Sequence, residues 1–159
     1  MKLLAIDPGN SMGLSCWNDG ELVDSFIWKF KSQVEAEIHL PHFINDYVHI
    51  NNIEKIVYED PVENGKRGNN LIKLAKKCGI IIAVASLKFI ECHSFNTSKL
   101  QTFIGATGKT ESKKKRIKQW VIEKYGEEHA KTQDQADAVA IGYSYIKILK
   151  ELENKNESK

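Results

Sequence analysis

The chain has 159 residues, of which 42% are hydrophobic and 28% are charged, and its formal net charge is +2. This length suits one globular domain with a real core, and a bilayer-spanning protein is excluded because no apolar run approaches roughly 20 residues. The N-terminus lacks a signal-peptide pattern and the three cysteines are scattered, so we expect a cytoplasmic protein without membrane contact or a zinc site.

The N-terminal part of the chain predicts two buried strands that each end in an acid. Residues 2–6 predict a buried strand, apolar from Leu3 onward, which stops at Asp7 and an Asp-Pro-Gly turn. Residues 12–30 predict a β-hairpin, because an Asp-Gly pair separates two apolar arms. Residues 53–58 predict the second buried strand, which stops at Glu59.

Helical patterns follow the hairpin and the second strand. Ser32 and Glu35 resemble a capping box, and the helix after them should be kinked or split at Pro41. A further helix is predicted from Leu71, and two readings of its end remain open. Gly79 either ends it or lies within it, because the apolar run that follows suits a buried helix or a strand equally well.

The C-terminal half predicts one more strand and further helices. Residues 87–95 are strand-like, residues 96–105 predict a short helix, and residues 111–125 predict a longer one. A second capping box at Thr132 begins the last helix. Residues 153–159 contain no apolar side chain, so we expect them to form a disordered tail after a single domain of residues 1–152.

This order of elements predicts an α/β fold with a mixed sheet. The strands near residues 4, 56 and 90 are joined through helices, so they should be parallel to one another. The hairpin supplies the antiparallel part of the sheet.

Four acids occupy positions where a site can form. Asp7 and Glu59 end predicted strands, and open α/β sheets bind ligands at the carboxyl ends of their strands. Asp134 and Asp137 are three residues apart near the start of the last helix, so they share a face. Converging carboxylates would repel one another without cations, and oxygen ligands suit Mg²⁺ or Mn²⁺. We therefore expect a two-metal phosphodiester site.

Each acid taken alone also has a structural explanation. Asp7 suits a turn, Glu59 suits a strand exit and Asp134 suits a helix cap. Asp137 is harder to explain in this way, because it lies within the otherwise apolar sequence QADAVAIG and a carboxylate there needs a partner.

A basic block lies between residues 109 and 118, with six bases, one acid and a net charge of +5. It predicts either a solvated helix face or a surface for polyanions. The Gly-Lys-Thr sequence at its start is not a nucleotide-binding loop, because Phe103 stands where that motif requires glycine, and we expect no nucleotide cofactor.

The sequences AIDPGN, IVYEDP and DQADAVAIG, in this order, resemble the RuvC-type Holliday-junction resolvases. That resemblance covers nearly the whole chain and implies a ribonuclease H-like fold, with a mixed five-stranded sheet flanked by helices. It also implies that Asp7, Glu59, Asp134 and Asp137 are the catalytic metal ligands. The short chain would suit a phage-encoded member.

The resemblance extends to the basic block. The sequence TGKTESKKKRI matches a family segment that carries a functional lysine, which falls on Lys114 with Lys113 as the near alternative. Lys99 resembles a second functional lysine. The family's aromatic residue three positions after the glutamate is replaced by Val62, so we do not expect the sharp sequence preference of the bacterial enzymes.

Together these features predict a metal-dependent endonuclease that cuts four-way junctions and other branched DNA, with two Mg²⁺ (or Mn²⁺) ions per site. The expected products carry 5′-phosphate and 3′-hydroxyl ends, and the two symmetric cuts imply a homodimer. A general ribonuclease H-like nuclease, a non-catalytic branched-DNA-binding protein and an actin-like ATPase remain alternatives. The residues expected to bind DNA are Lys66, Arg67, Lys99, Lys109, Lys113, Lys115, Arg116 and Lys118.

Overall fold

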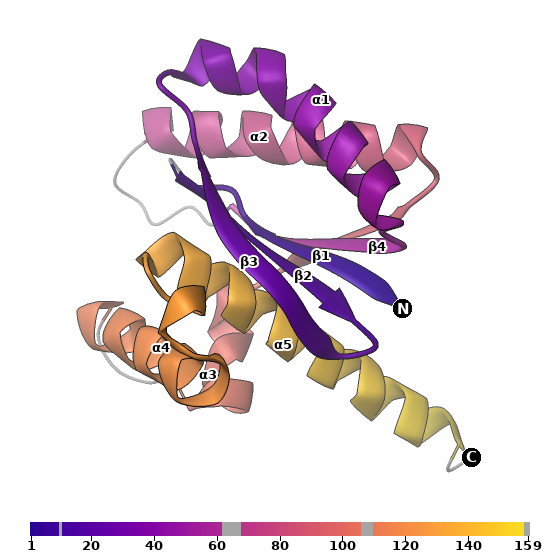
Figure 1. The fold of residues 1–159 in the computed structure, drawn as a ribbon, viewed down its shortest axis with the longest axis vertical. Helices are drawn as coiled ribbons and strands as arrows, with labels where there is room; N and C mark the ends of the chain where they lie inside the picture. The colour runs from indigo at the N-terminus through magenta and orange to yellow at the C-terminus, as the bar shows by residue number, and fades with distance from the viewer. Residues whose placement is uncertain (10, 62–67, 106–109, 158–159) are drawn as a thin grey trace.

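The computed structural model describes residues 1–9, 11–61, 68–105 and 110–157. Its centre is a five-stranded sheet in the order β3-β2-β1-β4-β5. Helices cover both faces, with α1 and α2 on one face and α3, α4 and α5 on the other (Figure 1). The strands are β1 (Lys2–Asp7), β2 (Ser11–Asn18), β3 (Glu21–Lys29), β4 (Lys55–Glu59) and β5 (Glu91–Phe95). The helices are α1 (Gln33–Asn51), α2 (Gly68–Leu87), α3 (Leu100–Ile104), α4 (Thr110–Tyr125) and α5 (Gln133–Glu157), with short 3₁₀ turns η1 (Thr97–Lys99) and η2 (Glu127–His129).

The sheet is mixed, as the sequence predicts. β1 pairs with β4 in parallel and β4 with β5 in parallel, whereas β1–β2 and β2–β3 are antiparallel. The predicted hairpin is β2–β3, and its turn places Asp19 at φ 50° and Gly20 at φ 90°. Both positive values are those of a type I′ turn, the two-residue loop whose backbone twist matches the twist of the strands that it joins.

The core has two halves, one on each face of the sheet. Leu3, Trp17 and Val139 belong to the half between the sheet and α5. Leu4 and Ile81 belong to the half between the sheet and α1 and α2. β1 is therefore buried on both sides, which explains why its sequence is a continuous apolar run rather than an alternating one.

The alternating direction of side chains along each strand decides the face of the sheet to which the two strand-end acids point. Side chains at positions two apart lie on one face of a strand. Leu3 and Ala5 face α5, so Asp7 follows them to the same side. Val57 also faces α5, and Glu59 follows it. The sheet thus presents both carboxylates to the helix that carries the other two acids.

Three predictions about the helices on the opposite face are tested by the structure. Of the two outcomes expected at Pro41, a kink or a split, the split is wrong, since α1 runs without a break from Gln33 to Asn51. Ser32 caps it as predicted, with its Oγ accepting a hydrogen bond of 3.1 Å from the Glu35 N–H. α2 continues through Gly79, where an added Cβ would meet no atom within 4 Å.

The C-terminal part of the chain is more helical than expected. Residues 96–105 and 111–125 contain the predicted helices, as η1, α3 and α4. α5 extends to Glu157, so residues 153–157, which we expected to be disordered, are helical in the structure. Among the described residues, no helix combines the length and apolar character that a membrane crossing requires.

Candidate active site

Asp7 and Glu59 lie side by side at one edge of the sheet. The parallel register of β1 and β4 ends with Ile6 opposite Tyr58, and each acid follows directly. Asp7 is only 7% exposed. Burial raises the pKa of Asp7 well above its ordinary value, and the negative charge of Glu59 adds to this effect. Two carboxylates in this position favour sharing a proton until a cation replaces it.

The other two acids reach the same place from the first two turns of α5, which begins at Gln133. Thr132 caps this helix, with its Oγ1 accepting a hydrogen bond of 3.2 Å from the Gln135 N–H. The charges of Asp137 and Asp134 contribute to the raised pKa of Asp7, which shows that the three carboxylates are close in space. The predicted convergence of acids from the two halves of the chain is therefore present in the geometry.

Burial shifts the titration of the remaining acids as well. It raises the pKa of Asp137 to about 6, although a hydrogen bond of 2.7 Å donated by the Gln133 amide opposes the shift. Burial also raises the pKa of Asp134 and of Glu59. For Glu59 the hydrogen bond to Asp7 acts in the opposite sense and lowers its pKa, against the effect of burial.

Glycine leaves room between Asp7 and Asp134. A Cβ on Gly9 would lie 3.5 Å from Asp7 Oδ1 and 3.8 Å from Asp134 Oδ1, so both oxygens border the space beside this residue. Within the described ranges, no three His, Cys, Asp or Glu side chains are already arranged around one metal position. The donor set nevertheless fits Mg²⁺ or Mn²⁺, because it consists of converging carboxylate oxygens whose mutual repulsion a divalent cation would relieve.

Two lysines of α4 act on these acids. Lys114 is exposed, and its positive charge lowers the pKa of Asp134, Asp137 and Glu59 against the effect of burial. Lys113 is half-buried and donates a hydrogen bond of 3.0 Å to the Thr97 carbonyl. The lysine assigned by resemblance thus lies within electrostatic range of the acid cluster, with Lys113 beside it.

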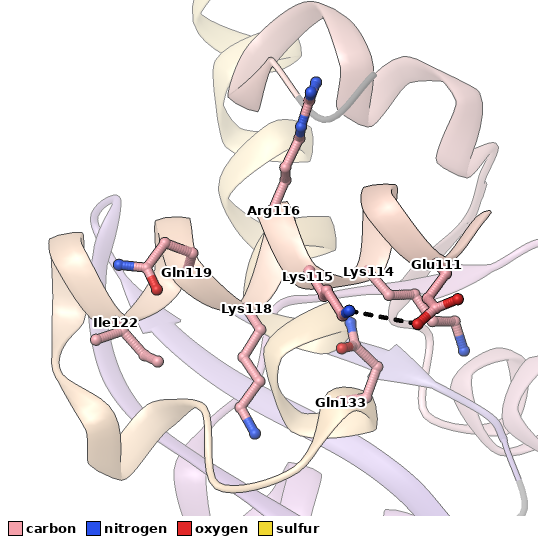
Figure 2. A pocket seen from close by; sticks show the side chains of 8 residues that line it. All are labelled: Glu111, Lys114, Lys115, Arg116, Lys118, Gln119, Ile122 and Gln133. Carbon is pink, nitrogen blue, oxygen red and sulfur yellow. Dashed lines mark ion pairs between the residues drawn. The ribbon is translucent and has the colours of Figure 1, made fainter. Parts of the chain in front are cut away.

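Basic side chains of α4 line an open pocket on the surface (Figure 2). Lys115 makes an exposed ion pair of 3.3 Å with Glu111, and Lys118 Nζ lies 3.4 Å from the Lys131 carbonyl oxygen. Gln133 at the start of α5 lines this pocket, and its amide donates the hydrogen bond to Asp137, so one residue links the pocket to the acid cluster. Its lining residues are Glu111, Lys114, Lys115, Arg116, Lys118, Gln119, Ile122 and Gln133.

The remaining residues assigned from the sequence are divided between described and undescribed parts of the chain. Lys99 is exposed in η1, directly after the Asn96 cap that follows β5. The others lie outside the described residues: Val62, Lys66, Arg67 and Lys109.

Two further polar side chains beside the site were missed by the sequence analysis. Lys77 is 4% exposed, and its Nζ donates to the Gly9 carbonyl. Gln135 is 3% exposed, and its amide donates to the main-chain carbonyl oxygens of Ser25 and Glu128 at 2.8 and 2.9 Å. A signal for Lys77 exists in the sequence, since it is four residues before Ile81 on the apolar stripe of α2, where a charge needs a partner.

The comparisons with known proteins bear on the fold. No protein-family model matches the sequence, and no curated protein matches it. Among solved structures, that of Thermus thermophilus RuvC in complex with a Holliday-junction substrate has a TM-score of 0.72 at 15% identity, covering 91% of this chain and 91% of that one. A fowlpox virus resolvase with Holliday-junction DNA has a TM-score of 0.61 at 15% identity, and the match covers 94% of this chain and 99% of that one. The yeast mitochondrial Holliday-junction resolvase Ydc2 has a TM-score of 0.54 at 12% identity, covering 90% and 76%.

The class of fold follows from these similarities and from the sheet. A mixed five-stranded sheet in the order β3-β2-β1-β4-β5, with helices on both faces, is an α/β fold of the ribonuclease H-like type. The structural neighbours are RuvC and other Holliday-junction resolvases, so the fold expected from the sequence motifs is confirmed.

Proposed function

We propose that the chain is a metal-dependent endonuclease that cleaves branched DNA, chiefly four-way junctions. The observation that supports this most strongly is the meeting of Asp7, Glu59, Asp134 and Asp137 at one edge of the sheet. It occurs in a chain whose fold matches resolvases, two of them solved with junction DNA. Four buried or half-buried carboxylates that lie close together repel one another, and this repulsion destabilises the fold. A bound divalent cation would relieve it, which explains why the acids are placed there.

In this proposal Asp7, Glu59, Asp134 and Asp137 would hold two Mg²⁺ or Mn²⁺ ions. When bound, such ions make a water molecule more acidic and stabilise the departing oxygen of a phosphodiester. Glu59 reaches the site from β4, and Asp134 and Asp137 reach it from α5. The proposed products carry 5′-phosphate and 3′-hydroxyl ends.

The lysines of α4 would act on the substrate rather than on the metal. Lys114 is exposed and close enough to influence three of the acids, so it can balance the charge that develops on the scissile phosphate. Lys113 remains the alternative for this role. The backbone of the DNA would follow the pocket beside α4. The residues proposed to contact it are Lys66, Arg67, Lys99, Lys109, Lys113, Lys115, Arg116 and Lys118.

We further propose that the active form is a homodimer. A junction has two symmetric cut sites, and one chain supplies one acid cluster. α2 carries exposed apolar side chains, Ile72 at 57%, Ile82 at 44% and Leu87 at 79%, which are candidates for the interface. Size measurement of the purified protein with and without junction DNA tests this part separately.

The test of the proposed function compares three substrates. The protein is incubated with a mobile four-way junction, a linear duplex of the same sequence and an RNA–DNA hybrid, in Mg²⁺, Mn²⁺ or EDTA. The proposal predicts paired nicks in the junction that require metal and are absent for Asp7→Asn. Preferred cutting of the hybrid would favour a general ribonuclease H-like nuclease, and junction binding without cutting in any metal would favour a non-catalytic binding protein.

A further inference from the structure

Lys77 is a buried cation that reaches the acid cluster from the other side of the molecule. It lies on α2, which covers the face of the sheet opposite α5 (Figure 1). Only 4% of Lys77 is exposed, so it cannot contact DNA directly. Burying an ammonium group costs several kcal/mol unless partners compensate for it. An apolar side chain at this position of the buried face of α2 would avoid this cost. The buried charge therefore indicates a specific role for Lys77.

The contacts of Lys77 lead to Asp7 through one residue. Its Nζ donates a hydrogen bond to the carbonyl oxygen of Gly9, and the same ammonium lies 5.4 Å from the centroid of the Phe30 ring. The N–H of Gly9 in turn donates to Asp7 Oδ1 at 3.2 Å. Gly9 is therefore held at both its amide and its carbonyl, and Lys77 fixes the residue that orients the Asp7 carboxylate.

The charge of Lys77 acts on two of the acids as well. It interacts favourably with Asp7 and with Asp134, the pair whose oxygens border the space beside Gly9. A fixed positive charge in this position reduces the repulsion between carboxylates that no metal has yet neutralised. It also repels a divalent cation that enters the site, so the same charge should lower the affinity of the site for metal.

We propose that Lys77 is a positioning residue of the candidate metal site. Its ammonium group holds Gly9, and through it Asp7, and serves as a built-in counter-charge that keeps Asp7 and Asp134 together before metal binds. This inference rests on the proposed function, because it takes these acids to be metal ligands.

The test measures Mg²⁺ affinity in the absence of DNA, by isothermal titration calorimetry. Lys77→Gln retains a hydrogen-bond donor and removes the charge. We expect it to bind Mg²⁺ about tenfold more tightly than the wild type, since one repulsive unit charge is lost near the ion. Its melting temperature without metal should fall. Lys76→Gln is the matched control, because the neighbouring Lys76 is 54% exposed and pairs with Glu37 at 2.9 Å; its Mg²⁺ affinity should equal that of the wild type.

The outcomes separate this inference from the proposed function. Wild type that binds Mg²⁺ and nicks junctions, with unchanged or weaker Mg²⁺ binding in Lys77→Gln, would overturn the role of Lys77 alone. Wild type without Mg²⁺ binding would overturn both. Lys77→Met, which suits the apolar stripe, is the second variant if Lys77→Gln does not fold. Variants that fold only with Mg²⁺ would support the proposal, and variants that fail to fold even with Mg²⁺ would contradict it.

Discussion

The main-chain carbonyl oxygen of Asp134 lies 1.9 Å from the position that a Cβ atom on Gly13 would occupy. β2 and the first turn of α5 are therefore packed backbone against backbone, at the level of the acid cluster. This close approach sets the distance of Asp134 and Asp137 from the sheet. Any side chain at position 13 must displace the start of α5.

Gly13→Ala should therefore destabilise the fold and disturb the site. Overpacking of this kind costs about 1–3 kcal/mol, and we expect chemical denaturation to show a loss in that range. Gly79→Ala is the control, since an added Cβ there meets nothing within 4 Å inside a helix, and it should stabilise by about 0.5–1 kcal/mol. Equal free energies of unfolding for the two variants would show that the start of α5 moves away from β2 at little cost and so contradict this prediction.

Removing the charge of Asp7 should stabilise the metal-free protein. The pKa of this acid is raised by burial and by neighbouring carboxylates, so its ionised form opposes folding at neutral pH. In EDTA, Asp7→Asn should melt above the wild type by about 2–4 °C, the shift that 1 kcal/mol produces in a chain of this size. Asp46→Asn, on the exposed side of α1, should leave the melting temperature unchanged. A lower melting temperature for Asp7→Asn would mean that the carboxylate has a structural role.

The stability of the metal-free protein should depend on pH through Asp137. Its pKa is about 6 in the folded chain, raised from 3.8 chiefly by burial. The folded state then binds more protons than the unfolded state between these values, so stability decreases as pH rises from about 4 to about 7. Melting curves in EDTA across this range test the sign, and Asp137→Asn should flatten the profile. Added Mg²⁺ should stabilise the protein at pH 7.5 and lose this effect below pH 5.5, because protonated acids do not bind it.

Lys114 and Lys115 are adjacent but should differ in what their removal changes. Lys114 is within electrostatic range of Asp134, Asp137 and Glu59, so Lys114→Ala should reduce single-turnover cleavage by about 100-fold with a small change in binding. Lys115 is 78% exposed, so Lys115→Ala should weaken junction binding and reduce the salt slope by about one unit. Identical behaviour of the two variants would contradict this division of roles.

The parts of the fold that the sequence predicts are those with strong local signals. The Asp-Gly turn and its two apolar arms define β2 and β3, and the apolar runs that end in Asp7 and Glu59 define β1 and β4. The meeting of Asp7 and Glu59 was also predictable, because parallel strands bring their carboxyl ends to one edge. That Asp134 and Asp137 join them was implied by the family resemblance, since these two acids lie on α5 rather than at a strand end. These inferences need only periodicity, turn chemistry and the rule for crossover connections.

The errors arise where tertiary contacts outweigh local preference. Pro41 does not break α1, whose flanking residues Leu40 and Ile44 are fully buried against the sheet and hold both halves of the helix in place. Gly79 could not be classified, because an apolar run after glycine suits a helix or a strand. Lys77 was missed because its partner, the Gly9 carbonyl, is a backbone atom 68 residues away that no side-chain motif reveals.

The most direct test of the central claim is the titration of Mn²⁺ into the purified protein, followed by calorimetry and by the electron paramagnetic resonance of the free ion. The claim is that the four acids form one divalent-cation site. It predicts saturable Mn²⁺ binding at neutral pH in the wild type, with the loss of at least one ion for Asp7→Asn and a marked weakening for Glu59→Gln and Asp137→Asn. Mn²⁺ binding that is absent from the wild type, or that is the same in all four proteins, would contradict it.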